Sequence, residues 1–253
     1  MTNEIEKNLE NFKKKGFFIK KNFFTKKEIS KFYNAINNIY KKKNINKNIL
    51  RYFEPSIFNK NKEILIRAEN FFKKDRVITE LIYNKKINYY LKKLFNEKPI
   101  LFKEKINFKP PGCRGELLHQ DSQAGWNKFT DRFINVLISI EKSDVSNGCL
   151  QFDISGNNCS KLIKKKMSPL KLLELKKPKL EKFEMMEGDV IFFNNYIPHK
   201  SLANKSKKSR IQVYLTYNAF SDGNFREEYF RQKRESFPPN NERIKGIRYK
   251  YKV

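Results

Sequence analysis

The stretch GDVIFFNNYIPHKSLANKSKKSRIQVYLTYN, residues 188–218, decides the fold that the sequence predicts. A Gly-Asp turn leads into the β-prone run Val190–Phe193, and a polar connection then leads into a second strand at Ser209–Asn218. Short strands separated by turn residues are typical of a β-sandwich or a β-barrel. The same organisation should therefore extend into the preceding part of the chain.

Strand signals begin at about Pro99. Ile100–Lys109 alternates apolar and polar side chains, which predicts a strand with one wetter face, and Phe133–Ile140 is a second β-prone run. The pair Asn147–Gly148 predicts a hairpin turn. Residues 99–220 are thus predicted to form a β-sandwich or barrel, with helices packed outside it.

The first third of the chain, residues 1–98, reads as mostly helical. Thr25–Glu28 has the form of a capping box, and behind it apolar residues recur at helical spacing as far as Tyr40. A second helix is predicted at about Asp75–Phe95. Residues 221–253 form a C-terminal extension, and without repeats or a sharp linker we expect residues 1–253 to be a single domain.

The formal net charge of +28 raises the possibility of a nucleic-acid-binding module. However, the cations comprise 44 Lys and 11 Arg, spread along the chain, which is typical of proteins encoded in AT-rich genomes. Nucleic-acid grooves usually rely on Arg as well. We therefore expect no nucleic-acid partner, although this surface would attract an anionic small molecule. Salt-dependent binding to unspecific DNA or RNA tests this alternative.

The compartment is predicted from the cysteines and from the apolar runs. The three Cys residues form neither a CxxC pair nor an even disulfide framework. The first ten residues are polar, and no apolar run approaches the ~20 residues of a membrane span. These features predict a cytoplasmic protein without a membrane partner, and they leave the oligomeric state unknown.

A candidate metal site involves both histidines of the chain, His119 and His199. His119-Gln120-Asp121 places an imidazole and a carboxylate two positions apart, so in a strand both would project from one face. With His199 they would form a facial triad of two His and one carboxylate, which suits an iron(II) oxygenase. An HxD pair alone is also compatible with a structural histidine, and the triad with a metal-binding cupin.

Two further polar residues follow His199. Arg210 stands at the head of a predicted strand and can form a two-pronged salt bridge with a carboxylate. Ser201 can add a hydroxyl donor to the same carboxylate. Taken with the HxD pair, this spacing favours a site for an anionic co-substrate beside a metal.

The chain resembles the phytanoyl-CoA dioxygenase family. The resemblance lies in LLHQDSQAGW (Leu117–Trp126), SNGCLQF (Ser146–Phe152), GDVIFFNNYIPHKSLANKS (Gly188–Ser206) and RIQVYLTYN (Arg210–Asn218), and more weakly in RYFEPS (Arg51–Ser56) and RAENFF (Arg67–Phe72). It implies a mainly β fold with flanking N-terminal helices: a double-stranded β-helix, or jelly roll, with iron at one mouth.

This resemblance also implies the roles of the candidate residues. His119, Asp121 and His199 match the iron(II) ligands, while Arg210 and Ser201 match the binders of the C5 carboxylate of 2-oxoglutarate. The implied activity is a hydroxylation that consumes 2-oxoglutarate and O2 and releases succinate and carbon dioxide.

A narrower resemblance concerns the substrate. The tail RQKRESFPPNNER (Arg231–Arg243) is similar to that of family members that hydroxylate 2-aminoethylphosphonate and its relatives. The substrate is therefore expected to be a small polar or anionic molecule, an aminophosphonate first. An acyl-CoA, an amino acid or a secondary metabolite remains an alternative.

Other polar and aromatic residues are candidates for contacts in the pocket. Lys105 and Asn107 share one face of the strand that leads towards the metal loop, and Lys105 is assigned to co-substrate binding. The remaining substrate candidates, beside Asn107, are Gln120, Trp126 and Arg114. Residues 155–179 are expected to help close the pocket.

Overall fold

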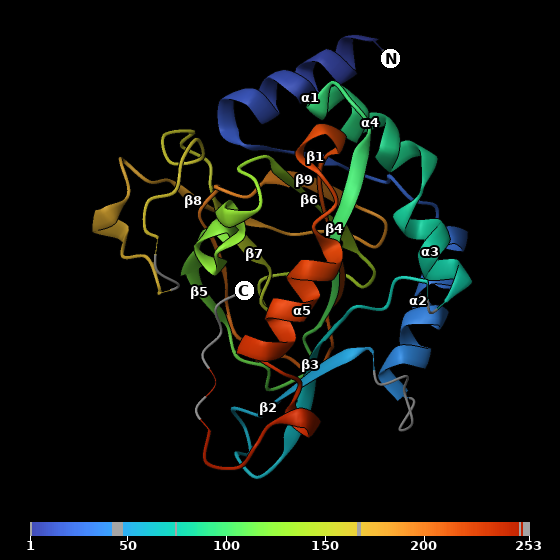
Figure 1. Cartoon of the computed structure of the whole chain (residues 1–253), viewed down its shortest axis with the longest axis vertical. Helices are drawn as coiled ribbons and strands as arrows, with labels where there is room; N and C mark the ends of the chain where they lie inside the picture. The colour runs from blue at the N-terminus through green and yellow to red at the C-terminus, as the bar shows by residue number, and fades with distance from the viewer. Residues whose placement is uncertain (1, 42–47, 74, 166–167, 248, 250–253) are drawn as a thin grey trace.

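The computed structural model describes residues 2–41, 48–73, 75–165, 168–247 and 249. Two antiparallel sheets face each other (Figure 1). The larger sheet has the order β1-β9-β6-β11-β4-β3-β2 and the smaller one the order β5-β10-β7-β8. The strands are β1 Phe17–Lys20, β2 Leu50–Pro55, β3 Glu63–Glu69, β4 Pro99–Phe108, β5 Glu116–His119, β6 Phe133–Ser139, β7 Leu150–Asp153, β8 Leu180–Phe183, β9 Val190–Asn194, β10 His199–Ser201 and β11 Ile211–Ala219. This arrangement is the predicted jelly roll.

Five α-helices accompany the sheets in the described part of the chain. They are α1 Thr2–Lys15, α2 Lys26–Lys41, α3 Arg76–Ile82, α4 Lys85–Phe95 and α5 Arg226–Ser236. Short 3-10 turns lie at η1 Asp121–Ala124, η2 Trp126–Lys128, η3 Leu172–Glu174, η4 Phe220–Asp222 and η5 Asn240–Glu242. Helices α2 to α4 lie along one side of the strands, α1 lies across the top end, and α5 crosses in front of them (Figure 1). No helix among these described residues is long and apolar enough to cross a membrane.

The core between α2, α3, α4 and the larger sheet follows from the helical periodicity. Ile36, Leu81 and Leu91 are fully buried and belong to one apolar cluster with Val136 and Val213 of the sheet. Burying each such side chain contributes roughly 1.5–3 kcal/mol. The outer face of the larger sheet is therefore fixed by helix packing, which leaves its inner face for the site.

The helix starts agree with the sequence in one case and differ in another. The capping box before α2 is confirmed, since Thr25 N–H donates to Glu28 Oε2 at 2.8 Å and Glu28 N–H donates to Thr25 Oγ1 at 3.2 Å. The single helix predicted at Asp75–Phe95 is wrong. It is divided into α3 and α4 at Asn84, whose side chain caps α4 by accepting from Lys86 N–H at 2.9 Å.

Three strands in the first third were missed by the helical interpretation of residues 1–98. The strands β1, β2 and β3 extend the larger sheet at both edges, with β1 beside β9 and β3 beside β4. The jelly-roll core is consequently not confined to residues 99–220. The predicted hairpin at Asn147–Gly148 is also wrong, because the turn joins β6 of the larger sheet to β7 of the smaller one.

Candidate active site

The two histidines meet because their strands pair. In the antiparallel pair β5 and β10, His119 and His199 stand directly opposite each other, and their ring centroids lie 4.3 Å apart. Asp121 approaches from η1, the 3-10 turn that follows β5. The expectation that His119 and Asp121 project from one strand face is therefore wrong: the chain turns at Gln120, and that turn brings the carboxylate to the imidazoles.

Each imidazole ring is oriented by a hydrogen bond to the backbone carbonyl two residues earlier in the chain. His119 Nδ1 lies 2.7 Å from the carbonyl oxygen of Leu117, and His199 Nδ1 lies 2.9 Å from that of Ile197. A carbonyl only accepts, so each Nδ1 carries the proton and each Nε2 lone pair is available to a metal. Burial, together with the neighbouring His119, lowers the pKa of His199 to about 4, which keeps this ring neutral.

The carboxylate of Asp121 is held by a buried amide. Asn135 Nδ2 donates to Asp121 Oδ2 at 3.0 Å, and Thr216 Oγ1 donates to Asn135 Oδ1 at 2.6 Å. Burial acts to raise the pKa of Asp121, but His199, Lys105 and His119 lower it on balance, so the group is ionised. Asn135 and Thr216 thereby fix one carboxylate oxygen.

Replacing Asn135 with alanine is expected to weaken iron(II) binding by about 10–100-fold, because the carboxylate loses the donor that orients it. Competition between the protein and a chelator for iron(II), without oxygen, measures the change. Asn157→Ala, which removes an exposed amide, is the matched control. A folded Asn135→Ala protein with wild-type metal affinity would contradict this role.

The three side chains suit one divalent metal ion. One ligand atom from each of His119, Asp121 and His199 lies within 4.8 Å of the others; Asp121 and His199 are buried, and His119 is partly exposed. Two imidazoles and one carboxylate leave several coordination positions open. The donor set therefore fits iron(II) in an oxygenase.

Arg210 and Ser201 lie in the same cavity as this triad. The Arg210 side chain is buried, and its Nη1 donates to the Gly148 carbonyl at 2.9 Å, while its Nε has no hydrogen-bond partner among the described residues. No carboxylate of the described segments forms an ion pair with it within 4.0 Å. A buried guanidinium without a carboxylate partner is costly unless an anion binds to it, so this site fits an anionic group such as a carboxylate.

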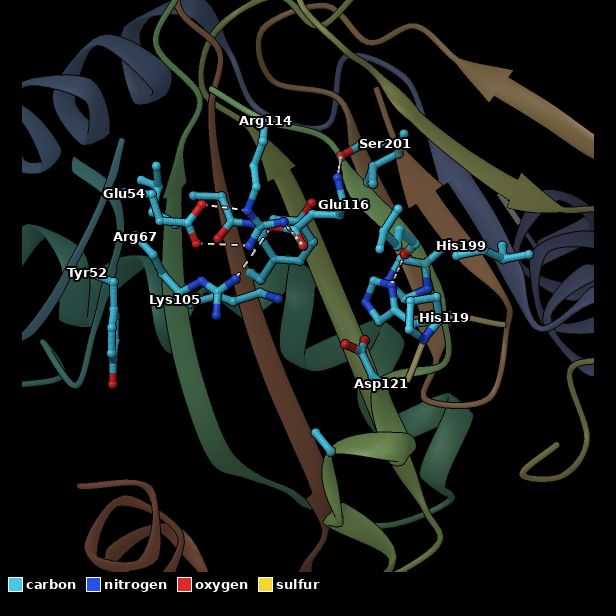
Figure 2. Close-up of a pocket in the computed structure, with 18 of the residues that line it drawn as sticks. Tyr52, Glu54, Arg67, Lys105, Arg114, Glu116, His119, Asp121, His199 and Ser201 are labelled. Atoms are coloured by element: carbon cyan, nitrogen blue, oxygen red, sulfur yellow. Dashed lines mark hydrogen bonds and ion pairs between the residues drawn. The ribbon is translucent and has the colours of Figure 1, made fainter. Parts of the chain in front are cut away.

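The cavity has a volume of about 300 Å³ and lies between the two sheets. Figure 2 shows Lys105 extending towards the iron ligands from one wall, with Arg67, Glu54 and Arg114 beside it. Lys105 Nζ lies 4.5 Å from the ring centroid of Tyr214. The wetter face of β4 thus faces a cavity rather than bulk solvent.

The other candidates from the sequence separate into two groups. Asn107, Trp126 and Arg114 line the cavity. Arg114 is already paired, since its Nη2 and Nε donate to the Glu54 carboxylate at 2.9 and 2.5 Å. Trp126 is 1% exposed and packs against Phe102.

The structure does not bring Gln120 to the cavity. Its amide donates to the carbonyls of Asn158, Lys161 and Tyr196, and its Oε1 accepts from Ile163 N–H at 2.7 Å. These bonds tether the connection after β7. That connection reaches the cavity through Ser168 and Pro169, in agreement with the expected contribution of residues 155–179.

Sequence reasoning missed several cavity residues on β2 and β3. Tyr52, Glu54 and Arg67 come from these strands. Their segments carried the weak family signal of the first third, which was the available clue. The sequence reasoning also left Lys109 unassigned, although this residue continues the polar face of β4 and contacts Ser201.

The fold and the site define a non-haem iron(II), 2-oxoglutarate-dependent oxygenase. The profile of the phytanoyl-CoA dioxygenase (PhyH) family matches residues 12–212, and the chain belongs to this family. It is 36% identical over 214 residues to a 2-aminoethylphosphonate dioxygenase from uncultured bacterium HF130_AEPn_1, which covers 79% of this chain and 76% of that relative. It is also 37% identical over 160 residues to a methylphosphonate hydroxylase from Gimesia maris, covering 63% of this chain and 61% of the relative.

Solved structures confirm the fold. EctD from S. alaskensis, crystallised with 2-oxoglutarate and 5-hydroxyectoine, superposes with a TM-score of 0.71 at 17% identity, over 85% of this chain and 76% of that one. The predicted jelly roll is thus confirmed. Membership of an oxygenase family also excludes a non-oxygenase metal cupin, whereas the absence of a nucleic-acid partner stays a prediction.

Proposed function

We propose that this oxygenase hydroxylates a small phosphonate, with 2-aminoethylphosphonate as the first candidate. The observation that carries the proposal is a pair of cations, Lys105 and Arg67, in the wall of the cavity that holds the iron ligands. Phosphonates are multiply charged anions, which such cations bind by charge-assisted hydrogen bonds. The similarity to a 2-aminoethylphosphonate dioxygenase supports the same substrate class.

An ammonium group would find acidic partners in the same wall. Burial acts to raise the pKa of Glu116, but Arg67 and Arg114 lower it to about 2, so Glu116 is ionised at neutral pH. Glu54 lies beside it as a partner of Arg114. The cavity therefore offers both signs of charge, which suits a zwitterion with a phosphonate at one end and an ammonium at the other.

The size of the cavity favours a small substrate. A volume of about 300 Å³ is at the lower end for ligand pockets, and it has to hold 2-oxoglutarate as well. A coenzyme A thioester would have to leave most of its mass outside. This argues against the acyl-CoA alternative.

We infer that Arg210 and Ser201 bind the C5 carboxylate of 2-oxoglutarate, and that His119, Asp121 and His199 hold iron(II). Iron and 2-oxoglutarate, when bound, supply the oxidising chemistry: substrate, 2-oxoglutarate and O2 give hydroxylated substrate, succinate and carbon dioxide. The chain's own share is to orient both ligands and to exclude water from the cavity. One domain would carry this activity, since β1–β3 join the larger sheet, which also contains β4, β6, β9 and β11. The buried thiols of Cys113, Cys149 and Cys159 support a reducing compartment such as the cytoplasm.

The test of this function is a substrate panel. Purified protein with iron(II) and 2-oxoglutarate is offered 2-aminoethylphosphonate, methylphosphonate, an amino acid, an acyl-CoA and a sulfonate analogue of the aminophosphonate. We expect succinate release and a product heavier by one oxygen atom with a phosphonate. Turnover of another class combined with no response to phosphonates would overturn the proposal.

Lys105→Met is expected to lower kcat/KM for the phosphonate by about 10–100-fold, because a charge-assisted hydrogen bond contributes about 1.5–3 kcal/mol. Steady-state kinetics at saturating 2-oxoglutarate measures it, and Lys182→Met, which removes an exposed lysine, is the control. The sequence assigned Lys105 to the co-substrate. A weaker affinity for 2-oxoglutarate with unchanged phosphonate kinetics would restore that assignment and refute the substrate role.

A further inference from the structure

A second buried cation lies next to Arg210. Lys109 N–H donates to the Arg210 carbonyl at 3.0 Å, and Arg210 N–H donates to the Lys109 carbonyl at 3.1 Å, so the two residues form a hydrogen-bonded antiparallel pair. The side chains of such a pair lie on the same face. Lys109 is 3% exposed and Arg210 is 2% exposed. Neither has a carboxylate partner within ion-pair distance in the described segments.

The ammonium of Lys109 is directed at Ser201. Lys109 Nζ donates to Ser201 Oγ at 2.8 Å, and Glu116 N–H donates to the same oxygen at 3.3 Å. The second of these bonds is visible in Figure 2. A hydroxyl oxygen has two acceptor positions and one proton. Both acceptor positions of Ser201 are therefore in use, and its O–H can only donate.

We propose that Lys109 is a positioning residue of the co-substrate site, whose ammonium occupies an acceptor position of Ser201 and so commits the Ser201 hydroxyl to donate to the C5 carboxylate of 2-oxoglutarate. This inference rests on the proposed roles of Arg210 and Ser201. Lys109 itself does not line the cavity, so it acts through Ser201 and through its charge. A neutral amine at Lys109 would instead accept a hydrogen bond from the Ser201 hydroxyl and turn that O–H away from 2-oxoglutarate.

The protonation state of Lys109 should consequently affect the binding of 2-oxoglutarate. The charged or titratable groups around it are Arg210 directly before β11, Cys113 and Arg114 in the loop after β4, and Glu116 on β5. Burial, followed by repulsion from Arg210, lowers the pKa of Lys109 to about 7.

The sign of the resulting pH dependence follows from linkage. A carboxylate that binds beside Lys109 raises its pKa, so binding takes up a proton above neutral pH. Affinity for 2-oxoglutarate is then highest below about pH 7 and falls as pH rises through the pKa of the free protein. The carboxylates of 2-oxoglutarate are ionised throughout this range and do not contribute.

The experiment is calorimetric titration of 2-oxoglutarate into manganese(II)-saturated protein, without oxygen, from pH 6.5 to pH 8.5. Two buffers with different ionisation enthalpies give the number of protons taken up. Wild-type protein should bind more weakly with rising pH and take up protons at the alkaline end. Lys109→Met should bind at least about tenfold more weakly at pH 6.5 and lose the pH dependence. Lys109→Arg, which cannot lose its proton, should also lose the pH dependence while retaining more affinity than Lys109→Met.

The control variants separate the possible failures. Lys207→Met removes an exposed lysine near Arg210 and should behave as wild type. If Lys109→Met keeps the wild-type affinity and pH profile while Arg210→Met loses binding, the Lys109 inference alone is wrong. If Arg210→Met also binds normally, the assignment of the co-substrate site is wrong. Thermal unfolding confirms that each variant is folded.

Discussion

Asp121→Ala protein is expected to fold and to bind iron(II) at least about 100-fold more weakly than wild type, and to lose turnover with it. Substitution of a residue that only orients a metal ligand lowers metal affinity by about 10–100-fold, so removal of the ligand itself should lower it further. Asp121 supplies the only carboxylate of the three-residue group. Anaerobic addition of iron(II) and 2-oxoglutarate should produce a weak visible charge-transfer band in wild type and none in the variant.

The matched control is Asp131→Ala, which removes a carboxylate from an exposed position close by in the sequence. It should keep the band and the metal content of wild type. If Asp121→Ala retained the band, the ligand assignment would be wrong, whatever its activity. Thermal unfolding in the absence of metal should show that Asp121→Ala is folded, because the change removes a buried charge.

Arg210→Met is expected to raise the dissociation constant of 2-oxoglutarate by about two to three orders of magnitude. Removing one partner of a buried ion pair costs about 3–5 kcal/mol, since the other charge stays buried without compensation. Arg210 is 2% exposed, so solvent screens the pair little. Titration of 2-oxoglutarate into the manganese(II) form measures the loss.

Iron(II) affinity in Arg210→Met should remain close to wild type, because Arg210 is not among the three ligands. At saturating 2-oxoglutarate, KM for the phosphonate should change little. An equal effect on substrate and co-substrate would refute the anchor role. Arg132→Met, at an exposed position, is the control for the loss of a guanidinium.

The parts of the fold that the sequence predicts are those with strong local patterns. The capping box before α2 and the strand β4 were predicted from patterns among neighbouring residues, and both are present. The strands β2 and β3 carry charged residues such as Arg51, Glu54 and Arg67 among apolar ones. The conformation of β3 depends on pairing with β4, and that of β2 on pairing with β3; the contact between β3 and β4 joins distant segments, and no local pattern records it.

The candidate site shows the same difference between what local sequence patterns predict and what contacts between distant segments decide. His119, Asp121, His199, Ser201 and Arg210 could be named because their types and spacing suit one chemistry, and the structure brings them to one cavity. Which side chains complete the cavity depends on strand register and on where the chain turns. Gln120 lies between two ligands in sequence, yet the 3-10 turn directs it to the opposite side, where it ties down a connection.

The direct pairing of His119 with His199 has a consequence for the cohesion of the smaller sheet. Strand β5 has four residues and lies at the edge of that sheet, with β10 as its hydrogen-bonded neighbour. A metal ion bound to both imidazoles joins these two strands, which are remote in sequence, by bonds that exist only in the folded chain. Its binding free energy then adds to the free energy of unfolding, about 2.7 kcal/mol when free metal is at 100 times its dissociation constant. Iron would therefore act as a cross-link at a short sheet edge, and its loss would first loosen β5, the edge strand that carries His119.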